Sequence, residues 1–323
     1  MNQKTLRILF TSAGRRVELT QCFRSAAERL GVQAEIHACD MAPDLSAACH
    51  MADASFTVPR ADAPDYIEVL AGYCQHQSID LLVPTIDPEL WPLSLARERF
   101  AEFGTKIHVS SPQTIEIVRD KRRTCEVLGA AGIPVPRTGT VEDVRTSPQS
   151  WDWPLFIKPS GGSASRGIGV LNSPDDLAET YDEPMIVQDC LEGDEYTINM
   201  YVGADGELRS AIPHLRRSIR AGEVEKGTTV RSPAFREIAE RIASVLPGAA
   251  GALCFQLIDD PRKGPRVFEI NARFGGGYPL ADRVGGRYAE SLLSSLLGKS
   301  ECASDDWREG VTMIRYDAAV FDG

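Results

Sequence analysis

The chain changes its pattern of apolar residues near Trp151, and this change limits the folds open to it. Before that point, short apolar runs alternate with amphipathic segments, whereas after it short strands follow one another with turn residues between them. Strands that alternate with helices form parallel sheets with right-handed crossovers, and strands joined by turns form hairpins. The sequence therefore predicts an α/β domain with a parallel sheet, followed by an α+β domain with an antiparallel sheet.

The expected elements can be placed along the chain. In the first part we expect strands at 6–10, 34–39, 79–83 and 106–109 and helices at 17–30, 66–76 and 112–129. In the second part we expect strands at 155–158, 167–171, 185–188, 195–202, 253–258 and 266–271. Ser232 caps the one clear amphipathic helix of that part, because Ser accepts a hydrogen bond from the first turn.

Composition narrows the classes of function. The chain has 323 residues, of which 43% are apolar, so it can bury a core without disulfides or metals. Its formal net charge of -11 argues against coating nucleic acid or an anionic membrane. Eight cysteines show no CxxC pair, and no apolar run reaches the ~20 residues of a membrane helix. We therefore expect a cytoplasmic protein without nucleic-acid or membrane partners.

Lys121 lies where a lysine is unusual. It falls on the apolar stripe of its expected helix, three residues after Val118 and four before Cys125. A lysine on such a stripe meets an anion or a polar cavity, because its charge is costly to bury alone. The alternative is a lysine at the core's edge whose ammonium reaches water.

Lys158 repeats this feature at the end of a strand. It is followed by the loop Ser160–Gly169, which contains four glycines and three serines. Glycines let backbone N–H groups approach phosphate oxygens, and serine hydroxyls add donors. The loop is not a Walker A loop, since the lysine precedes it and a strand follows. A flexible hairpin is the alternative interpretation.

Oxygen ligands gather on a third segment. Period-2 alternation places Glu269 and Asn271 on one face of their strand, and Gln256 can stand beside Glu269 in an antiparallel hairpin. One carboxylate and two amide oxygens suit Mg²⁺ shared with nucleotide phosphates. Arg273 follows two residues later, where a guanidinium can stabilise a transferring phosphoryl group. An ordinary polar strand face is the alternative.

The order and spacing of these elements resemble the ATP-grasp superfamily, and most closely the ligases similar to the carbamoyl phosphate synthetase large subunit. The resemblance implies a pre-ATP-grasp domain at 1–112, an ATP-grasp domain at 113–300 with a lid at about 124–187, and a tail at 301–323. It implies that Lys121 and Lys158 bind nucleotide phosphates, Lys158 and Arg273 serve catalysis, and Gln256, Glu269 and Asn271 bind metal. It assigns further nucleotide contacts to Ser160, Gly161, Gly162, Ser163, Gly167, Gln188, Asp189, Cys190, Leu191 and Glu195.

Two departures from the family pattern are visible. Gln188 stands where the family usually has a glutamate that contacts the adenine amino group, and a glutamine oxygen can still accept that bond. The chain also lacks a second synthetase half, which argues against carbamoyl phosphate synthesis itself.

The resemblance implies a carboxylate–amine ligase. ATP phosphorylates a carboxylate, and an amine then displaces phosphate to form an amide or peptide bond. The implied cofactors are ATP and Mg²⁺, with Mn²⁺ as a substitute. The implied partners are small-molecule carboxylate and amine substrates, with an amino acid among them, and a second copy of the chain in a homodimer.

Substrate residues are suggested by charge. One segment is rich in cationic side chains, among them Arg216, Lys226 and Arg231. These cations suit a carboxylate substrate, although a solvated connection between strands explains them equally well. Thr85, Asp87 and Glu89 follow a strand of the first domain, where acidic groups suit an amino group. Tyr278 ends the loop after Arg273 and is a further candidate. The segment Ser12–Arg16 either binds an anion or tightens a turn.

Three other functions are compatible with parts of the sequence. A nicotinamide-dependent oxidoreductase needs three fingerprint glycines, and Thr11–Gly14 has one. A catalytically idle ATP-binding or regulatory protein would not need the full set of two lysines, metal ligands and arginine. A carboxylase acting through carboxyphosphate shares the fold, but no biotin-carrier lysine motif is present.

Overall fold

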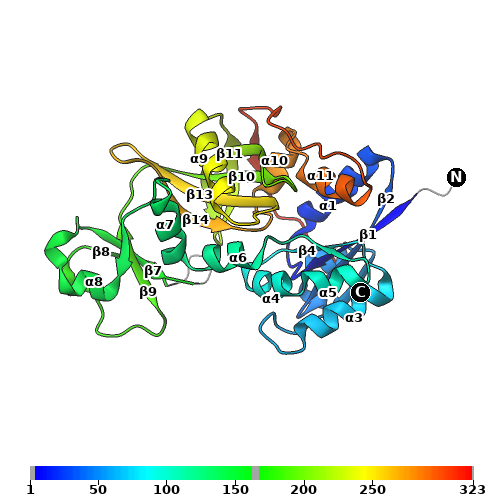
Figure 1. Ribbon diagram of the computed structural model, residues 1–323, viewed down its shortest axis with the longest axis horizontal. Coiled ribbons are helices and arrows are strands. Elements are labelled where there is room, and N and C mark those ends of the chain that lie inside the picture. Colours follow the sequence, from blue (N-terminus) through cyan, green and yellow to red (C-terminus); the bar gives the residue numbers. More distant parts are fainter. Residues whose placement is uncertain (1–3, 162–166, 322–323) are drawn as a thin grey trace.

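The computed structural model describes residues 4–161 and 167–321. Its first part is a parallel five-stranded sheet in the order β3-β2-β1-β4-β5, drawn in blue and cyan in Figure 1. Parallel pairing throughout this sheet confirms the α/β prediction. Its strands are β1 (Thr5–Thr11), β2 (Gln33–Asp40), β3 (Ala54–Thr57), β4 (Leu81–Pro84) and β5 (Lys106–Ile107).

Helices and two short 3-10 turns flank this sheet. They are α1 (Val17–Leu30), α2 (Ala47–His50), α3 (Tyr66–Gln77), α4 (Leu90–Leu95) and α5 (Arg97–Glu102), with short 3-10 turns η1 (Pro43–Leu45) and η2 (Asp87–Glu89). Strand order reverses between β1 and β4, so the loops after these two strands meet at the same point. Ligands of open parallel sheets bind at such a point.

A smaller antiparallel sheet stands apart at the left of Figure 1, in the order β6-β9-β7-β8. Its strands are β6 (Thr138–Thr140), β7 (Leu155–Pro159), β8 (Gly169–Leu171) and β9 (Met185–Asp189), with α8 (Val141–Thr146), η3 (Pro148–Ser150) and η4 (Pro174–Asp176) around them. Trp151, Leu155 and Val187 belong to its own apolar core. Lys158 therefore lies near the end of a strand, β7, whose apolar side chains pack into this core.

The central sheet has six antiparallel strands in the order β14-β13-β10-β11-β12-β15. They are β10 (Asp194–Val202), β11 (Leu208–Arg220), β12 (Glu223–Thr229), β13 (Gly251–Asp260), β14 (Gly264–Asn271) and β15 (Thr312–Ile314). Gln256 pairs with Glu269 across β13 and β14, as the sequence predicts. The helices α9 (Pro233–Val245), α10 (Tyr278–Val284) and α11 (Tyr288–Leu296) cover the sheet. Ser232 caps α9 by accepting the amide of Phe235.

Two sequence expectations are wrong at the level of elements. The helix expected over 112–129 is broken into α6 (Pro112–Arg119) and α7 (Lys121–Ala130), because Asp120 is extended and its carboxylate accepts the amides of Arg122 and Arg123. Lys121 is thus the first residue of a helix rather than a member of an interior stripe. The arginine-rich connection after Val202 is instead the long hairpin β11–β12, whose charged positions hid its strand pattern.

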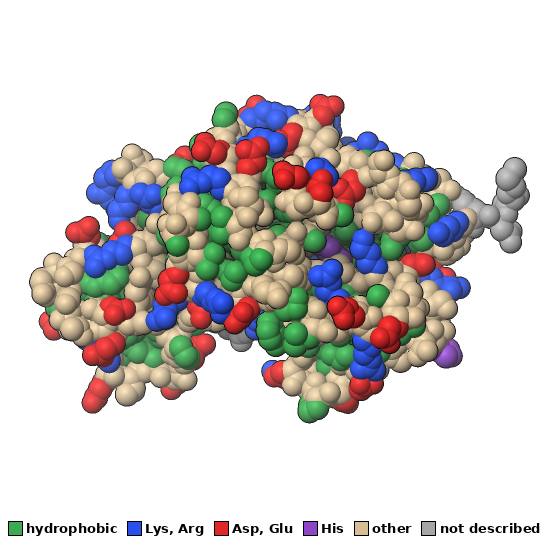
Figure 2. Space-filling model, in the orientation of Figure 1, with side chains coloured by type: hydrophobic (Ala, Val, Ile, Leu, Met, Phe, Trp, Pro, Cys, Tyr) green, Lys and Arg blue, Asp and Glu red, His purple; other side chains and the backbone are tan. Residues whose placement is uncertain are grey.

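The surface carries charges of both signs. Figure 2 shows Lys and Arg side chains interspersed with Asp and Glu side chains on the face drawn there. Among the described residues, no helix combines the length and apolarity that crossing a membrane requires.

Candidate active site

Two lysines from different elements converge on Glu269 of β14. Lys121 Nζ lies 3.8 Å from Glu269 Oε1 and 3.3 Å from the carbonyl oxygen of Gly161. Lys158, at the end of β7, directs its Nζ to the carbonyl of Phe268 at 3.4 Å. The small sheet, α7 and the central sheet therefore present two cations beside one carboxylate, which is an arrangement suited to phosphate oxygens and a divalent cation.

The side chain of Lys158 is largely shielded from solvent. Its side chain is only 6% exposed, and it lies over the ring of Phe268 at 5.1 Å. Burial lowers the pKa of Lys158 to about 8, while Glu269 opposes this change and Lys121 adds to it. An anion beside Lys158 would favour its charged form and raise its pKa again.

The glycine-rich loop begins next to Lys121. Ser160 donates to Asp120 Oδ1 at 2.9 Å, and the Ser160 carbonyl accepts the amide of Lys121 at 3.0 Å. Gly167 has a φ of 66°, which favours glycine. Gly162 and Ser163 lie outside the described residues, and phosphate contacts by this loop stay a prediction.

A row of polar side chains runs across the central sheet, from β11 through β10 and β13 to β14. Arg216 Nη1 pairs with Glu195 at 2.5 Å, and this arginine is almost fully covered. The amide of Gln256 connects the row: its oxygen faces Arg216 Nη1 at 2.9 Å and its nitrogen faces Glu269 Oε2 at 3.1 Å. Burial raises the pKa of Glu195, although Arg216 opposes the shift. Arg216 therefore contacts Glu195 and Gln256 rather than water, and its contact with a substrate stays a prediction.

The donor set fits a hard divalent cation in part. Glu269 offers a carboxylate and Asn271, 6% exposed at the end of the same strand, offers an amide oxygen. These are the oxygen ligands that Mg²⁺ prefers. Gln256, however, turns its nitrogen to Glu269, so it supplies an oxygen to the same point only after its amide rotates. In the described part of the chain, no three His, Cys, Asp or Glu side chains cluster as a metal site.

The predicted nucleobase contacts lie at the end of β9. Gln188 is buried, and its amide nitrogen donates to Thr138 Oγ1 at 2.8 Å. Asp189 pairs with Lys263 at 3.1 Å. Cys190 and Leu191 follow and are half-buried. The nitrogen of Gln188 is thus turned toward the protein, and contacts of these residues with adenine stay a prediction, as does the ribose contact of Glu195.

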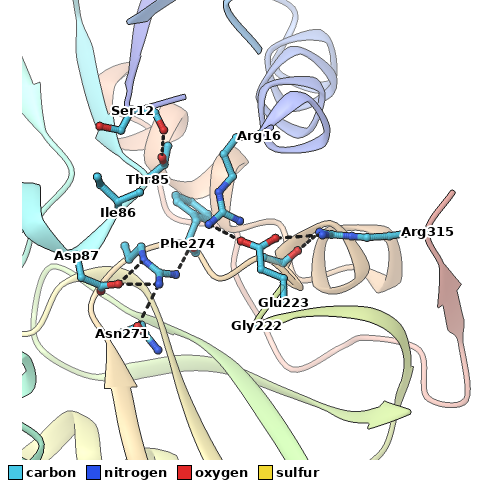
Figure 3. A network of polar contacts seen from close by, with 12 residues as sticks. Ser12, Arg16, Thr85, Ile86, Asp87, Gly222, Glu223, Asn271, Phe274 and Arg315 are labelled. Carbon is cyan, nitrogen blue, oxygen red and sulfur yellow. Dashed lines mark hydrogen bonds and ion pairs between the residues drawn. The ribbon is translucent and has the colours of Figure 1, made fainter. Parts of the chain in front are cut away.

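Arg273 joins the central sheet to the first domain. Its Nη2 donates to Asp87 Oδ2 at 2.8 Å and to Asn271 Oδ1 at 3.1 Å, contacts that Figure 3 shows beside a second ionic cluster. Burial disfavours the charge on Arg273, but Asp87, Cys254 and Glu269 together more than compensate and keep its pKa above the ordinary value. A guanidinium is thereby held next to an expected metal ligand.

Comparison with known families agrees with this geometry. Residues 118–277 match the family described as ATP-grasp domain, and residues 8–108 match the family described as PylC-like, N-terminal domain. Residues 118–277 belong to the ATP-grasp family.

Curated relatives match only part of this ATP-grasp chain. A carbamoyl-phosphate synthase of Methanobrevibacter smithii is 28% identical over 162 residues, which are 48% of this chain and 42% of the relative. A 3-methyl-D-ornithine–L-lysine ligase of Methanosarcina acetivorans is 30% identical over 174 residues, which are 52% of this chain and 43% of the relative. The chain therefore spans less than half the length of these curated relatives.

Solved structures show the same fold. Biotin carboxylase from Campylobacter jejuni superposes with a TM-score of 0.75 at 15% identity and covers 94% of this chain and 74% of its own. An L-amino acid ligase from Bacillus licheniformis has a TM-score of 0.71 at 17% identity, over 93% of this chain and 76% of its own. Both matches support the predicted ATP-grasp architecture.

Two substrate candidates of the first domain prove to be internal. Glu89 is 0% exposed, and its oxygens accept the hydroxyls of Ser12 and Tyr66 and the amides of Thr85 and Ile86. Thr85 is also buried and donates to the Ser12 carbonyl at 2.7 Å. The expectation that both face the cleft is wrong, because they tie the loops after β1 and β4 together. Of the three candidates Thr85, Asp87 and Glu89, Asp87 alone has its side chain in the site, where it pairs with Arg273.

Two candidates of the ATP-grasp domain also have structural roles. Tyr278 is buried, where its hydroxyl donates to Asp282 at 3.0 Å and accepts the amide of Ala289 at 2.9 Å. Arg231 stacks on Trp307 at 4.0 Å and donates to carbonyls of the C-terminal segment. These contacts give both residues a structural role, and substrate contacts by them stay predictions. Lys226 is exposed on β12, and its role stays a prediction.

Sequence reasoning missed two residues near Arg273. Glu223 begins β12 and forms ion pairs with Arg16 at 2.8 Å and with Arg315 at 3.2 Å. Arg16 had been left open between an anion site and a tight turn. Neither Glu223 nor Arg315 belongs to a sequence motif. They can be recognised only in the fold, which brings together segments that are far apart in sequence.

Proposed function

We propose that this ATP-grasp protein is an ATP-dependent carboxylate–amine ligase that forms an amide or peptide bond. The observation that carries the proposal is the convergence of Lys121 and Lys158 on Glu269, two residues before Asn271 and four before Arg273. Two cations from α7 and β7, two oxygen ligands on β14 and a largely buried guanidinium just after β14 are thus gathered at the end of one strand. A protein that only bound a nucleotide would not need that guanidinium.

Each residue has a defined task in the proposed reaction. Lys121 and Lys158 hold phosphate oxygens of ATP, and Glu269 and Asn271 would hold Mg²⁺, which when bound neutralises phosphate charge. A carboxylate oxygen attacks the γ-phosphorus, and ADP leaves. Arg273 stabilises the charge on the transferring phosphoryl group and then the oxyanion that forms when the amine attacks the carbonyl carbon. Phosphate leaves, and the amine proton passes to solvent.

The names of relatives support an amino acid among the substrates. Proteins named D-alanine–D-alanine ligase from Stutzerimonas stutzeri and 3-methyl-D-ornithine–L-lysine ligase both join amino acids. Asp87 adds a carboxylate beside Arg273, where an ammonium group can be received. A homodimer and the use of Mn²⁺ stay predictions.

The test is phosphate release from ATP with Mg²⁺ and pooled amino acids and amines. We expect release that requires one acid and one amine and that falls about a hundredfold or more in Lys158→Ala and Glu269→Ala. Glu126→Ala, an exposed glutamate paired with Arg122 on α7, is the matched control. ATP hydrolysis that no acid or amine stimulates would contradict the ligase proposal.

A further inference from the structure

A cluster of three ionic side chains lies beside Arg273 and is not used by the reaction proposed above. Arg16 precedes α1, Glu223 begins β12, and Arg315 follows β15. The Glu223 carboxylate accepts both guanidinium groups, at 2.8 Å and 3.2 Å. Figure 3 shows these residues next to the Asp87 and Asn271 contacts. The first domain, the central sheet and the C-terminal segment each contribute one member.

Burial distinguishes this cluster from a surface ion pair. The side chains of Arg16, Glu223 and Arg315 are 17%, 29% and 27% exposed, so they are shielded yet reachable. Burial lowers the pKa of Arg16, and Arg273 and Arg315 add to that shift. Although burial opposes it, the two arginines hold the pKa of Glu223 below its usual value, so it stays a carboxylate.

The cluster and its neighbours carry an excess of positive charge. Arg16, Arg273 and Arg315 face two carboxylates, Asp87 and Glu223, so one guanidinium charge has no counterion within this group. Each guanidinium has five N–H donors, and Glu223 and the Gly276 carbonyl engage part of those on Arg315. This excess of positive charge is partly desolvated and therefore favours a carboxylate ligand. The two oxygens of a carboxylate match the paired N–H donors of a guanidinium group.

The cluster is separated from the phosphate lysines. The ionic groups that act on Lys158 include Glu269, Lys121 and Glu195, whereas those that act on Arg16 are Glu223, Arg273, Arg315 and Asp87. Arg273 therefore stands between two groups of charges. A carboxylate bound by Arg16 and Arg315 would therefore lie among the charges around Glu223 and not among those around Lys158.

We propose that Arg16 and Arg315 hold a carboxylate of the amine substrate, distinct from the carboxylate that is phosphorylated. This inference rests on the ligase reaction proposed above and deepens it, because it makes the amine substrate an amino acid. Arg315 then makes the C-terminal segment part of substrate recognition. Glu223 keeps the two guanidinium groups apart and oriented, and it is a positioning residue.

Gly276 gives a second way to perturb this site without removing a charge. A Cβ atom at this position would lie 2.8 Å from a Glu223 carboxylate oxygen and 3.2 Å from Arg16 Nη1. Both are ends of flexible side chains, so Gly276→Ala should displace the cluster rather than unfold the protein. This variant is useful if Arg315 variants alter the C-terminal segment.

The experiment compares each amino acid with its carboxamide, which keeps the amine and side chain but lacks the negative charge. Binding is measured by calorimetry on the full chain with ADP and Mg²⁺, and phosphate release from ATP is followed in parallel. The wild-type protein should bind the acid about tenfold or more tightly than the amide. Arg315→Gln and Gly276→Ala should reduce this preference to about threefold or less, with KM for ATP changed about twofold at most.

Arg220→Gln is the matched control, because Arg220 also ties the C-terminal segment to the same hairpin, through Asp317 at 2.7 Å, but pairs with Glu225 rather than Glu223. It should keep the full preference. Equal binding of acid and amide by the wild type, or an unchanged preference in Arg315→Gln, would overturn the carboxylate site. If no amine stimulates phosphate release, the ligase reaction fails, and calorimetry still decides whether the carboxylate is bound.

Discussion

Arg273 and Asp87 stand 186 residues apart in sequence, and their side chains meet at 2.8 Å. Arg273 follows β14 of the central sheet, whereas Asp87 follows β4 of the first domain at the point where strand order reverses. Their ion pair therefore places the guanidinium between the two parts of the chain. It also fixes Arg273 against Asn271, beside the expected metal ligands.

This pair predicts a defect in turnover without a defect in nucleotide binding. Asp87→Asn keeps the shape of the side chain but removes the charge that orients Arg273, so kcat should fall about ten- to a hundredfold. KM for ATP should change about twofold at most, since Lys121 and Lys158 are untouched. Asp62→Asn, at an exposed ion pair with Arg60, is the control and should leave both constants unchanged. A rise in KM for ATP with constant kcat would contradict the role given to Asp87.

Lys158 predicts a pH dependence of nucleotide binding. With a pKa of about 8, this lysine loses its proton above pH 8 in the free protein, and phosphate oxygens raise its pKa in the complex. ATP binding must then take up a proton, so Kd for ATP should rise by up to about tenfold per pH unit above pH 8. Titration calorimetry between pH 7 and pH 9.5 measures this slope.

Lys158→Arg separates this lysine from other groups that titrate in the same range. Arginine stays protonated, so the increase in Kd above pH 8 should disappear even if affinity at pH 7 is lower. Lys299→Arg, at an exposed lysine after α11, should keep the wild-type slope. The same slope in Lys158→Arg as in the wild type would show that another group is responsible.

Glu269 predicts the metal requirement. Glu269→Gln keeps one side-chain oxygen but removes the negative charge beside the two lysines, so the Mg²⁺ concentration for half-maximal activity should rise about tenfold or more. Phosphate release measured over a range of Mg²⁺ at fixed ATP tests this expectation. Glu116→Gln, which alters an exposed pair with Arg123, serves as the control. An unchanged Mg²⁺ dependence would remove Glu269 from the set of metal ligands.

Glu89 predicts a loss of stability rather than of binding. Its two oxygens accept four donors, and a glutamine nitrogen at one position would face donors it cannot pair. Glu89→Gln should therefore lower the free energy of unfolding by about 1–3 kcal/mol at pH 7. Urea unfolding followed by circular dichroism measures it. Stability equal to that of the wild type would mean that the loops after β1 and β4 do not depend on this carboxylate.

Local patterns predicted the hairpin of Gln256 and Glu269 and four of the five strands of the first sheet, but not β3 or the short helices α2, α4 and α5. Helix α1 begins and ends at the expected residues, because apolar spacing and Gly31 mark it in the sequence. The pairing of Gln256 with Glu269 follows from two strands joined by a short turn. These features depend on residues close in sequence, where periodicity and turn residues are informative.

Contacts between distant segments were not predictable in the same way. Glu89 carries a charge, so its burial depends on partners from α3 and from the loop after β1. The hairpin β11–β12 contains arginines whose partners, Glu195 and Asp317, lie outside it. Arg315 reaches Glu223 only because β15 pairs with β12. Such residues acquire their roles from the fold, and a single sequence has no local signal for them.

The most direct test of the proposed reaction follows the oxygen atoms. A carboxylate substrate labelled with ¹⁸O is given to the protein with ATP, Mg²⁺ and the amine, and the released phosphate is analysed by mass spectrometry. If the carboxylate is phosphorylated and the amine then displaces phosphate, each phosphate carries one ¹⁸O from the acid. Phosphate without the label would show that water, not the carboxylate, attacks ATP, and would contradict the account.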